Sequence, residues 1–444
     1  MFGTIVSIII FVIGASLHKA RKTWIAPDVL FCYEWALITF LASLHLYKMD
    51  EASTWTWVII LTGTISFVIG VGGAIPKRYK RKPVMTTKDF FFNKPTFWLL
   101  YIIIFYFSWK DFLTTLIYQE MGYTLQEMRG AHFDSGAVAG FEVQKGAVQE
   151  ILNALQTATK LLIVAVGIHY YTVGEKRNFL YIIAVGGLVV MEAFTDGGRW
   201  GLAYLLIEVL VCFYFFRNSV NGKIAGSKST LNAILLAAVI VGFIIATSFA
   251  RGWETDIFLI KYYRYICGNI VFFDKHLASI PDDTPYFFIW NTFYGFWAMF
   301  LPFMRAVFGI PYPDSFDQAS KIIAGTLQDP VQIGSDMITN AFITPFFHPY
   351  GDGGIIGVIL GMMFLGFFAG SMYKKAIVNT NGRNVMVYLI VCQMLLHTIY
   401  YYPFAGNNYV FVVLFLFIYR KKTFNLIKTS HFTFKNKSKT ILLK

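Results

Sequence analysis

A long series of apolar stretches limits this chain to one class of fold. A transmembrane helix needs about 20 mostly apolar residues. Eleven stretches meet or approach that length, at 2–17, 28–47, 54–75, 95–118, 147–173, 179–195, 200–216, 230–249, 353–373, 384–402 and 408–419. A further region, 286–310, is interrupted by polar and helix-breaking residues, so a span, a re-entrant segment and an interfacial helix are all open. The sequence predicts an all-α polytopic membrane protein with 11–13 transmembrane helices and a single integral membrane domain, 1–444.

The composition agrees with this class and excludes several others. The chain is 56% hydrophobic and 14% charged, whereas soluble domains are about 25% charged. A soluble enzyme, a disordered scaffold and a nucleic-acid-binding module are therefore excluded, despite a net charge of +13. The four cysteines lie far apart without a CxxC pair, so neither a disulfide framework nor a zinc site is indicated. We expect no cofactor and no metal, and we interpret Asp282-Asp283 as solvated acids.

The loops between the apolar stretches fall into two classes by charge. One class carries 26 of the 38 Lys and Arg residues but only two acids, and consists of 18–23, 76–94, 174–178, 217–229, 374–383 and 420–444. Cytoplasmic loops carry an excess of Lys and Arg. These segments, including the basic tail 420–444, are therefore predicted to face the cytoplasm. The positive net charge then reflects membrane insertion rather than binding to a polyanion.

Two long loops are predicted on the opposite, outward side. The first is 119–146, and the second is 251–352, which is rich in aromatic residues and prolines. Loops of this length in a compact protein are usually functional or disordered, and an aromatic-rich segment has apolar surface to bury. We expect 251–352 to fold back onto the outer helix ends with membrane-associated or re-entrant segments, and to carry the functional site.

Several cations occur on this outward side, where positive charge is otherwise depleted. Arg199 and Arg251 each lie beside a glycine at the end of a span, and Lys261 and Arg264 are three residues apart. Such a spacing places two side chains on one face of a helix. Arg binds phosphate groups well because its planar fork donates hydrogen bonds in pairs. The cations thus predict a shared anionic ligand, with snorkelling to lipid headgroups as the alternative.

Two titratable residues precede the glycine-rich span 353–373. His348 and Asp352 are four residues apart, and either can take a proton from a sugar hydroxyl. Asp352 is equally suited to cap a helix N-terminus. Within the spans, Glu34, Lys160 and Glu208 must be paired or face a cavity, because a lone charge at mid-bilayer costs at least about 2.5 kcal/mol. A structural ion pair and a proton relay are both open for them.

The outward motifs resemble those of a known family, the bacterial oligosaccharide repeat-unit polymerases of the Wzy type. The likeness covers about 195–375 and is carried by Gly197-Gly198-Arg199, Arg251, the long aromatic loop, Asn340, Thr344 and Tyr350-Gly351-Asp352-Gly353. It implies a helical, GT-C-like glycosyltransferase in the bacterial inner membrane, with its active site outside and its C-terminus in the cytoplasm. Such an enzyme joins undecaprenyl-diphosphate-linked oligosaccharides into an O-antigen, capsule or exopolysaccharide.

The resemblance also assigns roles to residues and implies partners. His348 and Asp352 become catalytic candidates, the four cations bind the diphosphate, and the sugar-binding candidates are Trp253, Asn340 and Tyr350. The partners are polyprenyl-diphosphate-linked oligosaccharides and membrane lipid, with a chain-length regulator and a flippase as further candidates, and no nucleic acid. O-antigen ligases share the architecture and are one alternative. A secondary transporter or flippase is another, which predicts internal repeats that the sequence does not display.

Overall fold

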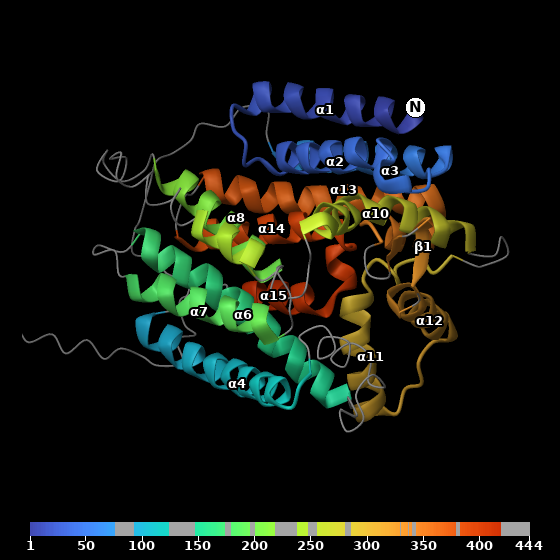
Figure 1. Ribbon diagram of the computed structural model, residues 1–444. Coiled ribbons are helices and arrows are strands. Elements are labelled where there is room, and N and C mark those ends of the chain that lie inside the picture. Colours follow the sequence, from blue (N-terminus) through green and yellow to red (C-terminus); the bar gives the residue numbers. More distant parts are fainter. Residues whose placement is uncertain are drawn as a thin grey trace, which may run out of the picture.

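A computed structural model of the chain describes residues 1–75, 93–123, 147–173, 179–195, 200–217, 238–246, 255–279, 286–328, 330–335, 337–339, 343–378 and 382–418. Almost all of these residues are helical (Figure 1). The longer helices are α1 (Phe2–Arg21), α2 (Pro27–Ser43), α3 (Thr54–Ala74), α4 (Lys94–Glu120), α6 (Ala147–Val173), α7 (Phe179–Thr195), α8 (Trp200–Arg217), α10 (Thr255–Ser279), α11 (Tyr294–Phe308), α12 (Asp314–Gln328), α13 (Phe347–Val378), α14 (Gly382–Leu396) and α15 (Asn407–Ile418). Three short 3-10 helices are η1 (Leu46–Lys48), η2 (His397–Ile399) and η3 (Pro403–Ala405).

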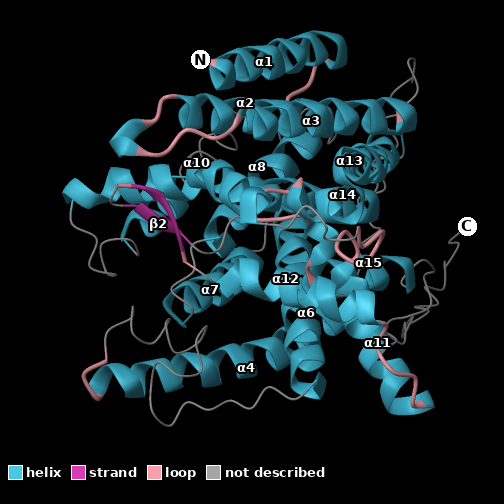
Figure 2. Cartoon of the chain, turned by 90° about the vertical axis from the view of Figure 1, so that its right-hand side faces the viewer, coloured by secondary structure: helices cyan, strands magenta, loops and turns pink. Residues whose placement is uncertain are grey.

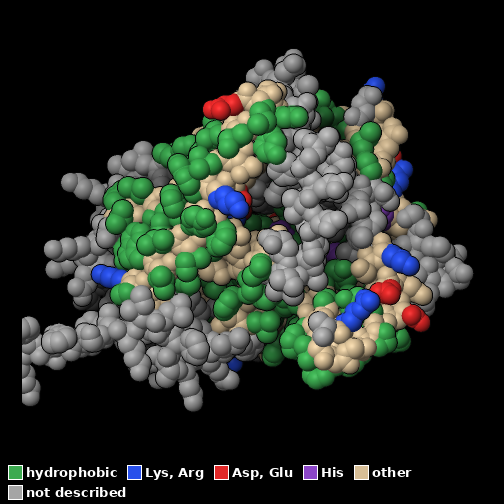
Figure 3. Space-filling model, turned by 90° about the horizontal axis from the view of Figure 1, so that it is seen from below, with side chains coloured by type: hydrophobic (Ala, Val, Ile, Leu, Met, Phe, Trp, Pro, Cys, Tyr) green, Lys and Arg blue, Asp and Glu red, His purple; other side chains and the backbone are tan. Residues whose placement is uncertain are grey.

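The predicted helical membrane architecture is confirmed in its main part. Four helices, α1, α3, α4 and α13, are long and apolar enough to cross a membrane, judged by length and composition. Three shorter apolar helices occur at 179–195, 201–212 and 383–399. Large apolar side chains such as Ile102 and Tyr106 on α4 are more than 60% exposed, and Figure 3 shows hydrophobic side chains over much of the described surface on this side. The number of 11–13 crossings stays a prediction.

Capping residues define where two of the spanning helices begin. Ser53 caps α3, since its hydroxyl accepts the backbone N–H of Thr56, and Asn93 caps α4 in the same way. Such caps satisfy backbone donors that have no partner inside the helix. Asp274 on α10 reinforces the first cap by accepting hydrogen bonds from the Ser53 backbone N–H and the Thr56 hydroxyl. These contacts hold α10 across the start of α3.

Glycines allow α3 and α13 to pack closely along their length. A Cβ at Gly366 would collide with the carbonyl oxygen of Phe67, and one at Gly70 with that of Met363. Small residues at such positions let membrane helices approach each other. Gly70 and Gly366 therefore let the backbones of the two helices come into direct contact. A Cβ at Gly73 would meet nothing within 4 Å, although the two helices are still in contact at this level, where a Cβ at Gly370 would lie 2.9 Å from the Ala74 Cβ.

The helix bundle has two ends, which we name by the predicted orientation. The outer end contains residues 44–53 and 343–352, and the inner end contains residues 73–75 and 374–378. In Figure 1, α1, α2, α3 and α13 lie side by side, and β1 lies near the end at which α13 begins. A single long helix, α13, thus connects the two ends.

Two of the charged residues inside the helices, Lys160 and Glu208, have partners of different kinds. Lys160 on α6 forms an ion pair with Glu192 on α7, with 2.5 Å between Nζ and Oε1. Glu208 on α8 is instead fully buried and accepts a hydrogen bond from the side-chain amide of Gln393 on α14. Pairing of Lys160 within the helices is confirmed, but its partner is Glu192, because adjacent antiparallel helices bring these two positions to the same depth.

The described residues of 251–352, the segment predicted to face outward, form the helices α10, α11 and α12, the first turn of α13 and a small hairpin. Strands β1 (Val331–Gly334) and β2 (Met337–Thr339) are antiparallel, so the fold is not purely α-helical (Figure 2). Their β-branched residues alternate between the interior and the surface, with Ile333 buried and Ile338 exposed, which is the pattern of a half-buried strand. The helix-based prediction missed this hairpin.

Of the three arrangements open for 286–310, a complete crossing by α11 fits poorly. The helix has 15 residues and is therefore about 22 Å long, short of the roughly 30 Å hydrocarbon core. Residues 288–293, just before the helix, form turns. Aromatic contacts, including Tyr294 stacked on Phe316, join α11 to α12. This segment stays close to the outer end.

Candidate functional site

The start of α13 is buried at the outer end and contains strained backbone. Thr344, three residues before the helix, has φ 76°, which is unusual for a β-branched residue and costs about 1–3 kcal/mol. A β-bridge to Tyr401 and a hydrogen bond from the Ile343 N–H to the Tyr400 carbonyl hold the segment in place. Thr344 is fully buried, and its hydroxyl has no hydrogen-bond partner among the described residues. Strain of this kind is concentrated at functional sites.

His348 lies in the first turn of α13, next to this strained segment. Its side chain is buried, and Nδ1 has no hydrogen-bond partner among the residues described. The aromatic rings of Phe347 and Tyr401 lie 5.6 Å and 6.0 Å from the imidazole, centroid to centroid. An imidazole nitrogen without a partner is free to accept a hydrogen bond from a donor that reaches it.

A second imidazole, His397, lies on the other side of Tyr401. The ring centroids of His397 and Tyr401 are 4.8 Å apart, and these two rings are perpendicular. The Nδ1 atom of His397 is hydrogen-bonded to the hydroxyl of Tyr204 on α8, and Nε2 has no partner in the described part of the chain. The sequence analysis missed His397. The only signal was its place before the aromatic run Tyr400-Tyr401-Tyr402.

Asp352 clamps a distant turn rather than standing free in the site. Its two carboxylate oxygens accept the backbone N–H groups of Asn291, at 2.9 Å, and Thr292, at 2.7 Å. Its own backbone carbonyl accepts the N–H of Phe288, and that of Gly351 accepts the N–H of Phe287. The side chain is 6% exposed. Asp352 therefore makes a capping contact, although to the turn before α11 and not to its own helix.

Two glycines break α13 immediately after Asp352. Gly353 and Gly354 are non-helical, and Gly354 has φ 57° and ψ −141°, a conformation open only to glycine. A Cβ on Gly354 would also lie 2.7 Å from the hydroxyl oxygen of Tyr286. The turn that bears His348 and Asp352 is thereby separated from the long membrane-crossing part of α13.

Helix α10 carries two cations and packs near His348, Tyr401 and His397, which together we call the imidazole corner. Lys261 and Arg264 lie on one helix, so the predicted shared face is confirmed. The guanidinium of Arg264 donates to the carbonyl of Ile338, at 3.0 Å. Five residues further along α10, the amide of Asn269 donates to the carbonyl of Ile399, next to the Tyr400–Tyr401 segment. Arg264 is thus about 8 Å along the helix axis from Asn269, the residue of α10 that contacts this segment.

The remaining predicted residues divide into those placed by the structure and those outside it. Tyr350 accepts a hydrogen bond from the indole N–H of Trp55 at 3.3 Å, so an aromatic pair joins the starts of α13 and α3. The sequence analysis did not single out Trp55, which is 48% exposed. The other predicted residues lie outside the described residues, and they are Arg199, Arg251, Trp253 and Asn340.

Other chemistries find less support near this corner. Burial raises the pKa of the Cys267 thiol on α10 to about 12, so the group stays protonated at neutral pH and is a poor nucleophile. Within the described ranges, no three His, Cys, Asp or Glu residues are grouped to bind a metal ion.

Comparisons of the chain with protein-family models, curated proteins and solved structures found no match. The functional assignment therefore depends on the chain's own residues.

Proposed function

We propose that this chain is a membrane glycosyltransferase of the repeat-unit polymerase type. It transfers a growing oligosaccharide from undecaprenyl diphosphate to the nonreducing-end hydroxyl of a new lipid-linked unit on the outer side of the membrane. The observation that carries the proposal is the buried, unpartnered Nδ1 of His348 at the outer end, close to a helix with two cations. A base and a phosphate-binding surface are the two parts that such a transfer requires.

In the proposed reaction, the acceptor hydroxyl oxygen attacks the anomeric carbon of the donor chain. A new carbon–oxygen bond forms, and the bond from this carbon to the diphosphate oxygen breaks. His348 accepts the proton of the hydroxyl, and undecaprenyl diphosphate leaves with the electron pair. Lys261 and Arg264, together with Arg199 and Arg251 from the sequence prediction, stabilise the charge that develops on the diphosphate. The energy of the donor bond drives the transfer, so no nucleotide is required.

The proposal includes a local opening around His348. This side chain is only 3% exposed, so a sugar hydroxyl reaches the imidazole after a surrounding segment has moved. Gly353 and Gly354 separate the His348 turn from the rest of α13, and this break lets the turn move without bending the spanning helix. Asp352 joins the turn to residues 291 and 292 through its carboxylate. In the proposal these hydrogen bonds stabilise the closed conformation, and Asp352 is not the base.

Substitution of His348 tests the proposal directly. His348→Gln keeps polarity and similar size but removes the base, so we expect polymer formation to fall by about 10²–10⁴, as for loss of a general base. The readout is the length distribution of the surface polysaccharide, with membrane levels of the protein matched. His397→Gln is the matched control, because this second imidazole lies behind Tyr401. Normal polymer in the His348→Gln strain would contradict the proposal.

The product that accumulates separates polymerase from the alternatives. Arg199→Ala and Arg251→Ala should leave surface glycolipid bearing a single repeat unit, because export of that unit does not need a polymerase. Arg→Lys should rescue only in part, since the charge returns without the bidentate fork. Polymer that stays on its carrier lipid would instead identify a ligase. Loss of all outward repeat units would identify a flippase.

A further inference from the structure

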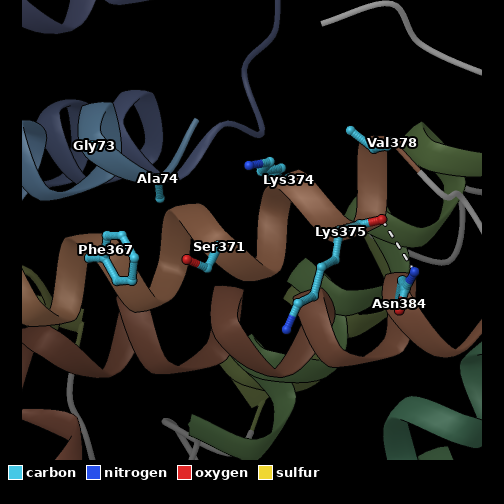
Figure 4. A pocket seen from close by; sticks show the side chains of 8 residues that line it. All are labelled: Gly73, Ala74, Phe367, Ser371, Lys374, Lys375, Val378 and Asn384. Atoms are coloured by element: carbon cyan, nitrogen blue, oxygen red, sulfur yellow. Dashed lines mark hydrogen bonds between the residues drawn. The ribbon is translucent and has the colours of Figure 1, made fainter. Parts of the chain in front are cut away.

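A cavity opens at the inner end, far from the imidazole corner. It has a volume of about 450 Å³ and lies between the ends of α3 and α13 and the start of α14. Gly73 and Ala74 border it from α3, and Phe367 and Val378 form apolar walls on α13 (Figure 4). Lys374 lies 20 residues after the break at Gly354, or about 30 Å, which equals the thickness of the hydrocarbon core. The cavity is therefore at the depth of the opposite membrane interface.

Polar groups line the mouth of this cavity and carry net positive charge. Ser371, Lys374, Lys375 and Asn384 all border it. Figure 4 shows Lys374 turned toward the end of α3 and Lys375 extending on the other side of α13, so the two ammonium groups flank the cavity. Neither lysine forms an ion pair with any acid that the structure describes. The side-chain amide of Asn384 donates a hydrogen bond to the Lys375 carbonyl, which fixes the start of α14 against the end of α13.

An exposed apolar stripe leads from the cavity toward the middle of the membrane. It is formed on α13 by Ile356, Leu360, Phe364 and Phe367, which are 44–64% exposed. Their spacing of three or four residues puts them on one face of the helix. On α3, Ile65 and Ile69 are also exposed, one turn apart. A soluble anion has no apolar part that could contact these exposed residues, whereas the acyl chains of a lipid can pack against them.

We propose that this cavity binds the headgroup of an anionic phospholipid. Lys374 and Lys375 neutralise the phosphodiester, the hydroxyl of Ser371 donates a hydrogen bond to one of its oxygens, and the acyl chains lie along the Ile356–Phe367 stripe. Basic pockets between membrane helices on the cytoplasmic side bind such headgroups. A zwitterionic lipid fits less well, because its ammonium would face two lysines without a nearby described carboxylate.

Native mass spectrometry of the full chain in detergent tests this site. Phosphatidylglycerol is titrated against phosphatidylcholine with the same acyl chains, and bound-lipid adducts are counted. We expect phosphatidylglycerol to be preferred. Lys374→Gln combined with Lys375→Gln should weaken its binding by roughly 30-fold, because each variant removes the attraction of one lysine to an anionic headgroup. Lys19→Gln with Lys22→Gln is the matched control, since both residues are exposed at the inner end of α1 but do not border the cavity.

A second variant tests the cavity without changing its charge. Gly73→Leu places a side chain where a Cβ meets nothing within 4 Å, so the fold should tolerate it while the cavity fills. We expect it to reduce phosphatidylglycerol binding at least as much as the double lysine variant, with unchanged circular dichroism. Equal binding of both lipids, or unaltered phosphatidylglycerol binding in both variants, would overturn the proposal. Competition by millimolar inorganic phosphate would show a free-anion site and overturn the lipid assignment. None of these outcomes depends on polymerase activity.

Discussion

The polar side chains are buried at the outer end of α13 and exposed at its inner end. At the outer end, Asp352 is buried with both oxygens bonded to backbone N–H groups, and His348 is buried with one nitrogen unpartnered. At the inner end, Lys374 and Lys375 are exposed and border an open cavity. Burial of polar groups is costly unless each is bonded, so only the outer end requires a precisely fitted surrounding. A reaction needs such fixed geometry, whereas attachment of a fluid lipid does not.

Separating α3 from α13 should damage both ends at once, and this is the largest effect we expect. Gly366→Leu drives a side chain into the Phe67 carbonyl, where overpacking costs about 1–3 kcal/mol or more. We expect a clear drop in melting temperature in detergent, with loss of both polymer and bound phosphatidylglycerol. Gly187→Leu on α7 is the control, since a Cβ there meets nothing within 4 Å. Loss of only one function would show that the ends are independent.

Removing the Asp352 carboxylate should affect the outer end alone. Asp352→Ala leaves two buried backbone N–H groups unpaired, at about 1–3 kcal/mol each, and Asp352→Asn should retain one of the two hydrogen bonds. We expect the melting temperature to fall in the order wild type, Asn, Ala, with lipid binding at the inner end unchanged. If Asp352 is instead the base, both variants would lose polymer formation by a similar factor while the Asn variant stays as stable as the wild type.

The strain at Thr344 should give the smallest change in stability. Thr344→Gly relieves the positive φ and removes a buried hydroxyl that has no partner in the described structure, so we expect stability to rise by about 1 kcal/mol. Polymer formation should nevertheless decrease, because the strained segment positions His348. Thr344→Ser, which keeps the hydroxyl, should preserve activity. Unchanged stability in the glycine variant would show that the backbone is relaxed.

The sequence predicted what depends on local pattern. Apolar length predicted the long apolar helices, and the spacing of Lys261 and Arg264 predicted a shared helix face. These features depend on residues within a few turns of each other, so they can be inferred from spacing. The inward and outward assignment of the loops is also such an inference, and it stays a prediction.

The contacts between distant segments could not be predicted in this way. Asp352 caps backbone about 60 residues earlier in the chain, and Lys160 pairs with Glu192, an acid that the sequence analysis did not single out. His397 joins the outer corner only because residues 397–402 pack against the start of α13. Such pairings depend on how whole helices pack, and no periodicity along the chain encodes the depth at which two helices meet.

The ion pair between Lys160 and Glu192 also bears on how the protein is made. Each charge lies 13 residues from the short connection between α6 and α7, and each alone would be costly to place in lipid, at about 2.5–3.5 kcal/mol for a lysine at mid-helix. If α6 and α7 both cross the membrane, as the sequence predicts, the second helix of the hairpin neutralises the first during synthesis. We expect α6 to leave the protein-conducting channel together with α7, so a nascent chain that stops after residue 178 should integrate poorly until α7 has been translated.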